Sequence, residues 1–427
     1  MKKIELLAPA GDLEKFITAV KYGADAVYFG GEMFSLRAGA GNLTFDEMKE
    51  GLEFAHLHTN SNDEPVKCYL TVNIFAHNED IQPLREYLTK IKIMGEENPL
   101  HKVDGFIVSD PGIVSLIKEI IPEGEIHLST QANMTNYQTA KFWYDFGVKR
   151  IVLARELSFK EIRELRENTP DDLEFEAFIH GAMCISYSGR CLLSNFMIQR
   201  DANHGECAHP CRWKYALVEE QRPGEYFPIE EDERGTYILN SKDLCMIEYI
   251  PKLIECGLSS LKIEGRMKSP FYVATIVSAY RKAINAYYES VENGTEYVVK
   301  QEWIDEMSKV SHRKFTTGFY FKHPDENDQN YESSQYIRDY TFTGVVKSYD
   351  ENTGYAIVEQ RNKMSIGDEI EITGPFRDTF TQILEEMYDE EGNPIESCPH
   401  PKQIIKVKMD KPVSEDCMIR KSVLKLK

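Results

Sequence analysis

The feature that most constrains the fold is the alternation of short apolar runs with amphipathic helical segments along the first two thirds of the chain. Residues 5–9 are a short strand-like run that is apolar after Glu5, and beyond it Leu13, Phe16 and Val20 lie on one helical face. Repeated roughly seven or eight times, this strand–loop–helix unit predicts parallel strands joined by crossover helices. An α/β fold of the TIM-like (β/α) barrel type fits the number and length of the repeats, and a doubly wound open sheet is the alternative.

We expect strands at residues 66–72, 105–108, 125–128, 150–154 and 173–179. Polar residues follow several of these strands. In either fold, ligands bind at the C-terminal ends of the parallel strands. Each polar residue at such an end is therefore a candidate site residue, or else a solvated loop residue. The candidates are Asn73, Gln131, Arg155, Glu156, His180 and the turn Glu264–Arg266.

The length of the chain, 427 residues, exceeds what one ordinary core holds, so more than one domain is expected. We predict a (β/α) barrel over 1–290, with a cysteine-rich insertion at about 181–245, and a helical linker over 291–336. Residues 337–427 contain short strand patterns separated by turn residues, which predict a small C-terminal all-β barrel domain. That domain either faces RNA or another partner, or serves only as a packing module.

The charge balance restricts the partners, because the formal net charge is −20. Phosphate contacts need Lys and Arg, so a broad nucleic-acid-binding face is not expected, and any RNA must be met by a focused site. No run approaches the roughly 20 apolar residues of a membrane helix, and the apolar run at the N-terminus is too short for a signal peptide. We therefore expect a cytoplasmic protein with no membrane partner.

The chain has nine cysteines, and five of them lie between residues 184 and 245. A disulfide framework is not expected in the cytoplasm. The segment lacks the Cys-x-x-Cys pairs of zinc ribbons, and the chain has no His-Glu-x-x-His helix and no Gly-x-Ser-x-Gly elbow. Soft thiolates on a loop-rich excursion suit an iron–sulfur cluster of the [4Fe–4S] type. The alternative is a set of inert buried cysteines.

The run from Glu176 to Ser194, Glu-x-Phe-x-x-Gly-Ala-Met-Cys-x-x-x-x-Gly-x-Cys-x-x-Ser, resembles the signature of the peptidase U32 family, or collagenase-like proteases. Further segments that resemble family landmarks are residues 7–11, 26–30, 262–266 and 312–320. The branch it resembles, with an extra β domain at the C-terminus, is that of the prephenate-dependent tRNA hydroxylases. The resemblance implies oxygen-independent formation of 5-hydroxyuridine at the tRNA wobble position, with prephenate as the co-substrate.

The resemblance also implies which cysteines bind the cluster. They are Cys184, Cys191, Cys207 and Cys245, with Cys211 as an alternative fifth candidate. The remaining cysteines have no motif around them and are expected to be structural: Cys68, Cys256, Cys398 and Cys417.

A small dicarboxylate such as prephenate needs cationic side chains, and Arg offers bidentate geometry. The substrate-binding candidates are Arg37, Arg155 and Arg266, and then Lys262. His180 could act as an acid or base near neutral pH, and a flipped uridine could stack on Tyr187, Tyr28 or Phe29. The catalytic candidates are thus His180, Tyr187 and Glu176, the last at the start of the signature.

Two other function classes stay open. A peptidase would use Cys184 as the nucleophile with His180 as its base, although no recognisable triad or protease metal site is present. A non-catalytic scaffold would bind RNA or a partner and keep the cluster for structure. The expected partners are tRNA and a small dicarboxylate, with a paralogous subunit or a second copy of the chain as further possibilities.

Overall fold

The structure is a computed structural model of the whole chain. The residues that it describes are 2–35, 41–183, 189, 191, 193–200, 207–212, 216–217, 227–228, 242–322 and 336–423. Among the predicted site residues, Arg37, Cys184 and Tyr187 lie outside these ranges.

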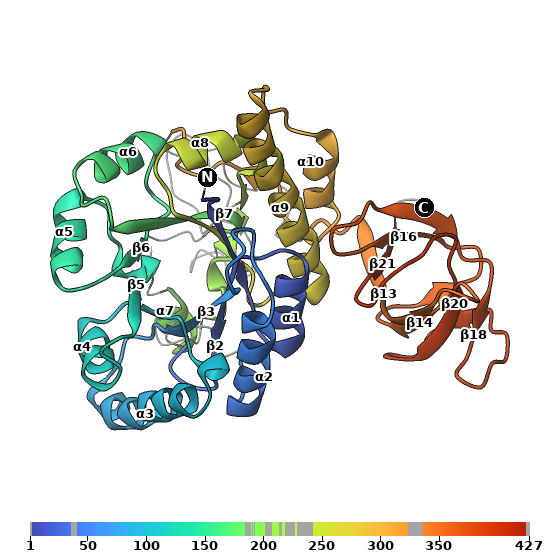
Figure 1. The fold of residues 1–427 in the computed structure, drawn as a ribbon, viewed down its shortest axis with the longest axis horizontal. Coiled ribbons are helices and arrows are strands. Elements are labelled where there is room, and N and C mark those ends of the chain that lie inside the picture. The colour runs from blue at the N-terminus through green and yellow to red at the C-terminus, as the bar shows by residue number, and fades with distance from the viewer. Residues whose placement is uncertain are drawn as a thin grey trace.

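The N-terminal part is a closed barrel of parallel strands surrounded by helices (Figure 1). Neighbouring strands pair in chain order, and β11 closes the barrel by pairing in parallel with both β1 and β7. The predicted TIM-like barrel is therefore confirmed, and the open sheet is not formed. The barrel strands are β1 (Glu5–Pro9), β2 (Ala26–Gly30), β3 (Lys67–Val72), β4 (Gly105–Val108), β5 (Glu125–Leu128), β6 (Arg150–Val152), β7 (Glu174–Ala182) and β11 (Ser260–Ile263).

The helices that pack on the outside of the barrel begin where the sequence places capping residues. The Asp12 side chain accepts a hydrogen bond from the Lys15 amide at 2.9 Å, and Phe16 and Val20 are buried beneath the helix. No described helix is long and apolar enough to cross a bilayer. The outer helices are α1 (Leu13–Lys21), α2 (Phe45–His56), α3 (Ile81–Glu97), α4 (Pro111–Ile120), α5 (Tyr137–Asp145), α6 (Phe159–Glu167), α8 (Ile250–Glu255), α9 (Pro270–Asn293) and α10 (Gln301–Ser308).

Between β7 and β11 the chain makes the cysteine-rich excursion. Its described elements are α7 (Leu193–Ile198), β8 (Ala216–Leu217), β9 (Phe227–Pro228) and β10 (Asp243–Cys245). β10 adds to the barrel sheet beside β7, and β12 (Phe315–Thr316) pairs with β10 in turn. The segment that follows α10 thus supports the strand that carries Cys245.

The C-terminal part is an antiparallel all-β domain with its own apolar core, as predicted. Its main sheet has the order β17-β16-β21-β13-β14-β20-β18, and no pairing that closes β17 onto β18 is seen among the described residues. The strands are β13 (Tyr340–Asp350), β14 (Tyr355–Gln360), β15 (Met364–Ser365), β16 (Glu369–Thr373), β17 (Phe380–Ile383), β18 (Met387–Tyr388), β19 (Ser397–Cys398), β20 (Ile404–Lys408) and β21 (Met418–Ser422).

The C-terminal domain lies beside α9 and α10 (Figure 1). The rings of Phe271 and Phe342 stack with their centroids 5.2 Å apart, and the buried Arg420 guanidinium pairs with Glu306 of α10 at 2.6 Å. A buried bidentate pair fixes orientation more firmly than an exposed pair does. Ion pairs at the two ends of α1 add to this contact: Glu14 with Arg361, and Lys21 with Asp416.

Candidate functional site

The C-terminal end of β7 is where the predicted site residues begin to meet. β10 runs antiparallel to this end of β7, pairing Asp243 with Ala182 and Cys245 with His180. Cys184 follows Ala182 by two positions in the sequence. The register therefore places Cys245 beside β7, the strand that leads into Cys184, although Cys184 and Cys245 are 61 residues apart in the sequence.

Tyr280 on α9 links these two strands. Its hydroxyl donates to the Ile179 carbonyl at 2.9 Å and accepts from the Met246 amide at 3.0 Å. The same oxygen lies 4.0 Å from Cys245 Sγ and 3.4 Å from His180 Nδ1. Sequence reasoning missed Tyr280 because it belongs to the apolar face of a long amphipathic helix, where an aromatic residue indicates only core packing.

His180 is buried among the rings of Tyr272, Tyr280 and Phe315. Burial, aided by the positive charges nearby, lowers the pKa of His180 to about 3. The imidazole is therefore neutral near neutral pH, and this environment gives no support to its predicted role as an acid or base. A neutral ring can still donate or accept one hydrogen bond, so a catalytic part for His180 stays a prediction.

Two glycines, at the end of β7 and shortly after it in the sequence, approach other backbone segments closely. Gly181 has φ +108°, and a Cβ there would lie 2.6 Å from the Glu264 carbonyl oxygen. Gly189 has φ +71°, and a Cβ there would lie 2.2 Å from the carbonyl oxygen of Gln131. The Gln131 side chain in turn accepts from Asn73 Nδ2 at 2.8 Å. Gly181 and Gly189 therefore lie against strand-end residues that the barrel rule nominated.

The cysteines of the excursion differ from the others in exposure. Those that the structure describes are half-buried and form no disulfide, whereas the four with no motif are fully buried, as predicted for structural residues. Segment 207–212 contacts α7 through a hydrogen bond, which the Ala208 amide donates to the buried Ser194 hydroxyl at 3.2 Å. Half-buried, unbridged thiols are the type that can bind a metal cluster. They are Cys191, Cys207, Cys211 and Cys245.

A second group of metal-ligand types lies at the opposite, N-terminal end of the strands. Ligand atoms of His56, Cys68 and Asp104 lie within 4.8 Å of one another, the one such set among the described residues. All the same, these groups already bond within the protein. His56 contacts the Leu100 carbonyl at 2.7 Å and Asp104 at 3.0 Å, and the Asp104 carboxylate accepts from the Cys68 amide at 2.7 Å. We assign this group a structural role.

Two of the predicted cationic residues lie at strand ends. Arg155 donates to the Ala182 carbonyl at 2.5 Å, and its guanidinium lies 4.3 Å from the centre of the Phe178 ring. Arg266 is buried and donates to Ser35 Oγ at 2.7 Å and to Asn42 Oδ1 at 2.5 Å. Both arginines thus border the barrel mouth, from the β6–β7 side and the β1–β3 side. Substrate binding by either stays a prediction.

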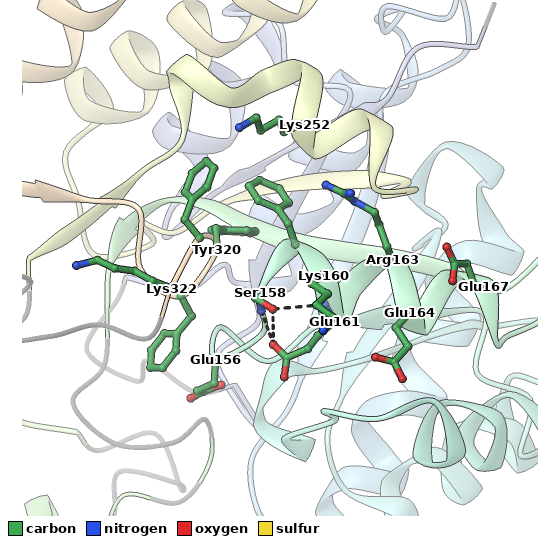
Figure 2. A pocket seen from close by; sticks show the side chains of 13 residues that line it. Glu156, Ser158, Lys160, Glu161, Arg163, Glu164, Glu167, Lys252, Tyr320 and Lys322 are labelled. Atoms are coloured by element: carbon green, nitrogen blue, oxygen red, sulfur yellow. Dashed lines mark hydrogen bonds between the residues drawn. The ribbon is translucent and has the colours of Figure 1, made fainter.

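A pocket of about 910 Å³ opens on the flank of the barrel, between α6, α8 and residues 319–322 (Figure 2). Its lining includes Glu156, the residue after Arg155, and is a mixture of aromatic and charged side chains. Among these residues sequence reasoning nominated Glu156 as a site residue, and it noted Phe319 and Tyr320 only as part of a family landmark. The residues from α6 and α8 lie on helix surfaces that carry no motif.

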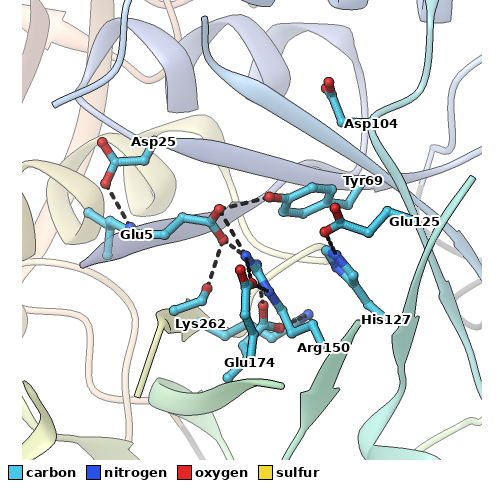
Figure 3. A network of polar contacts seen from close by, with 12 residues as sticks. Glu5, Asp25, Tyr69, Asp104, Glu125, His127, Arg150, Glu174 and Lys262 are labelled. Atoms are coloured by element: carbon cyan, nitrogen blue, oxygen red, sulfur yellow. Dashed lines mark hydrogen bonds and ion pairs between the residues drawn. The ribbon is translucent and has the colours of Figure 1, made fainter. Parts of the chain in front are cut away.

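The other predicted residues, Glu176 and Lys262, lie inside the barrel in a buried ion-pair network (Figure 3). Lys262 Nζ bonds Glu176 at 2.6 Å and lies 4.3 Å from the Tyr28 ring centre. Arg150 pairs with Glu5 at 2.5 Å, with Glu174 at 2.7 Å and with Glu176 at 3.2 Å.

This network occupies the interior that aliphatic layers fill in many barrels. Glu176 and Lys262 neutralise each other there, so the roles predicted for them in catalysis and substrate binding receive no support from their positions. The stacking proposed for Tyr28 and Phe29 is likewise unsupported, because both rings are buried in the barrel wall and interior.

The ion-pair network should make the stability of the protein depend on pH in the acid range. Burial acts to raise the pKa of Glu5, but the charge and hydrogen bonds of Arg150 outweigh it and bring the pKa down to about 2. A carboxylate whose pKa is lowered in the folded state stabilises the fold fully at pH values above its pKa in the unfolded chain, which is 4.5. That contribution is lost as the pH falls from 4.5 toward 2. Glu5 alone accounts for about 3 kcal/mol of this loss.

We therefore expect the free energy of unfolding, measured by urea denaturation at a series of pH values, to fall most steeply below pH 4.5. Glu5→Gln removes the titrating group and flattens the curve in this range, whereas Glu64→Gln, at an exposed loop carboxylate, leaves it unchanged. Identical slopes for Glu5→Gln and the wild type would contradict the assignment.

Comparison with known proteins bears on the whole chain. Residues 11–330 match the sequence model of peptidase family U32, and residues 338–420 match that of the peptidase family U32 C-terminal domain. The chain is 45% identical to tRNA hydroxylation protein P1 of Bacillus subtilis strain 168, covering 98% of this chain and 95% of the relative. It is 37% identical to tRNA hydroxylation protein P of Escherichia coli K12, covering 93% and 92%.

A relative with a different name is the collagenase of Porphyromonas gingivalis W83, which is 34% identical over 90% of this chain and 89% of its own length. Both family models together span the barrel, the excursion and the β domain. By these matches the chain belongs to peptidase family U32.

Proposed function

We propose that the chain is an RNA-modifying hydroxylase that forms 5-hydroxyuridine at the wobble position of tRNA without molecular oxygen. The observation that carries the proposal is the match, over nearly the whole of both chains, to a protein named for tRNA hydroxylation. We propose further that Cys184, Cys191, Cys207 and Cys245 hold a [4Fe–4S] cluster, with Cys211 as the alternative ligand, and that prephenate is the co-substrate.

The donor set suits such a cluster. The excursion thiols that the structure describes are half-buried and form no disulfide, and the pairing of β10 with β7 holds Cys245 next to the strand that runs into Cys184. When bound, the cluster would supply one-electron redox chemistry. Tyr280 fixes both strands through two backbone hydrogen bonds, and so holds the Cys245 backbone in position.

The residues of the barrel mouth have separate tasks in this proposal. Arg155 and Arg266 border the mouth and would bind the carboxylates of prephenate, with Arg37 as a third candidate. Lys262 contributes less, because its ammonium group is already paired with Glu176. The neutral His180 ring would orient a substrate or a backbone group by a single hydrogen bond rather than transfer a proton near neutral pH.

The test is nucleoside analysis of tRNA from a strain that lacks the gene. We expect 5-hydroxyuridine and nucleosides made from it to disappear, and to return on complementation with the wild-type chain but not with Cys245→Ser. Cys398→Ala, at a buried cysteine of the C-terminal domain, is the control and should restore the modification. Unchanged wobble nucleosides in the deletion strain would rule out the proposal.

A peptidase is the second candidate, and the collagenase-named relative favours it. Gelatin or collagen cleavage by the anaerobically purified protein, abolished in Cys184→Ser but not in Cys398→Ala, would support this function. A non-catalytic scaffold predicts instead that the deletion strain keeps its 5-hydroxyuridine and that the protein binds RNA.

A further inference from the structure

We propose that the pocket between α6 and α8 binds a nucleotide of the RNA substrate next to the one that is modified. The base would stack on Phe321, and its phosphate would contact Arg163 and Lys252. This inference rests on the proposed function, since it takes RNA as the substrate. It adds a binding site outside the barrel mouth (Figure 2).

Phe321 supplies a stacking surface. Its side chain is 44% exposed, although the residue before it, Tyr320, is buried. The Phe321 ring is supported by Phe159, with centroids 5.2 Å apart, and by Tyr249 at 4.7 Å. A partly exposed aromatic ring that neighbouring rings hold in place is a usual platform for an unpaired base.

Cationic groups lie beside this ring. Lys252 Nζ lies 4.7 Å from the centre of the Phe321 ring, and Arg163 lines the same pocket from α6. Both side chains are exposed, and neither forms an ion pair within the part of the chain that the structure describes. Unpaired cations next to an exposed aromatic ring suit a ligand that has both a flat base and a phosphate.

The acidic residues of the pocket do not all compete with its cations. Glu161 is used at the start of α6, where its carboxylate accepts from the Ser158 amide at 2.8 Å and the Ser158 hydroxyl at 2.6 Å. Figure 2 shows the Glu161 and Glu164 carboxylates pointing away from Lys252, while Glu167 lies farther along α6 beyond Arg163. Lys252 and Arg163 therefore supply local positive charge in the pocket of a chain that is acidic overall, as a focused RNA contact requires.

The pocket and the candidate site are connected by two adjacent residues of the chain. Glu156 lines the pocket, and the residue before it, Arg155, donates to the Ala182 carbonyl at the start of the cysteine-rich segment. One RNA strand can then place a nucleotide in the barrel mouth and its neighbour in the pocket. A free nucleotide would have no such second anchor, so we infer an RNA strand as the ligand.

The experiment measures binding of an anticodon stem-loop RNA, with uridine at the wobble position, to the full-length protein by fluorescence anisotropy. We expect Phe321→Ala to raise Kd roughly tenfold, because stacking on an aromatic ring contributes strongly for each base. The double variant Arg163→Gln/Lys252→Gln should weaken binding at low salt and reduce the slope of log Kd against log salt by about two.

A matched control exists outside the pocket, at the end of α5. Lys118 Nζ lies 5.3 Å from the centre of the Phe146 ring, which is another exposed aromatic–cation pair. Phe146→Ala and Lys118→Gln should leave Kd within about twofold of wild type. Near-ultraviolet circular dichroism and iron content, unchanged in every variant, exclude misfolding as the cause of weaker binding.

The outcomes separate the two proposals. Suppose that wild type binds the RNA and that the deletion strain lacks 5-hydroxyuridine. If Phe321→Ala and the double variant then bind the RNA as wild type does, the pocket proposal is overturned while the hydroxylase proposal stands. If wild type binds no RNA and the wobble nucleosides are unchanged in the deletion strain, the hydroxylase proposal fails with it. Equal loss of affinity in the Phe146 and Phe321 variants would also overturn the pocket assignment.

Discussion

Arg150→Met is expected to lower the free energy of unfolding by about 3–5 kcal/mol, which is enough to unfold many domains. The substitution removes the one guanidinium that pairs with Glu5, Glu174 and Glu176 inside the barrel. Glu5 then keeps only the hydroxyl groups of Tyr69 and Ser260 as partners. Breaking a buried ion pair is costly because a charge stays in the interior without compensation.

Arg85→Met is the matched control for this prediction. Arg85 forms an ion pair with Glu119 at 2.6 Å, but both side chains are exposed and screened by solvent, so its removal should change the free energy of unfolding far less than removal of Arg150 does. Urea denaturation of both variants at pH 7 measures the difference. Adding Glu5→Gln to Arg150→Met should recover part of the loss, because it removes a buried charge. Equal stability of the Arg150 and Arg85 variants would contradict the assignment.

The second large effect is expected for Cys245→Ser, which should lose most of its iron when purified anaerobically. Cys191→Ser and Cys207→Ser should behave alike, because all three thiols belong to the proposed ligand set. Iron and sulfide per chain, together with the visible absorption spectrum, measure the effect without reference to activity. Cys398→Ala should keep its iron, since that residue is buried in the core of the C-terminal domain.

The same measurement decides the place of Cys211. If the four ligands are those proposed, Cys211→Ser keeps its iron, and if Cys211 replaces one of them, that variant loses it. Thermal unfolding of each variant separates loss of the cluster from loss of the fold. Full iron content in Cys245→Ser would remove the reason for assigning a cluster to the β7–β10 pair.

The barrel could be predicted from the sequence because each repeat of strand and helix can be recognised from neighbouring residues alone. Each strand and each helix shows its own apolar pattern, and two predicted strands, Gly105–Val108 and Glu125–Leu128, agree with the observed bounds. β7 was predicted to end at Ile179 but runs to Ala182. Gly181 and Ala182 pair with β10, which returns from the excursion, and that contact is not visible in a local pattern.

The candidate site was less predictable for the same reason. A strand pattern does not say which charged residue faces the interior, so Glu176 and Lys262 were assigned to the site, although they pair inside the barrel. Arg150 and Glu5 went unnoticed, because only barrel closure brings together residues 145 positions apart. Cys245 was found because cysteines cluster in the sequence, whereas Tyr280 carries no such signal.

Closure of the barrel also has a consequence for the order in which the protein is made. β1 is synthesised first, but its second neighbour, β11, emerges from the ribosome only after the whole excursion has been translated. The contacts of α1 with the C-terminal domain come later still. The nascent N-terminal strand therefore keeps one edge without its native partner until β11 has been made, and such an edge is prone to pair with other chains.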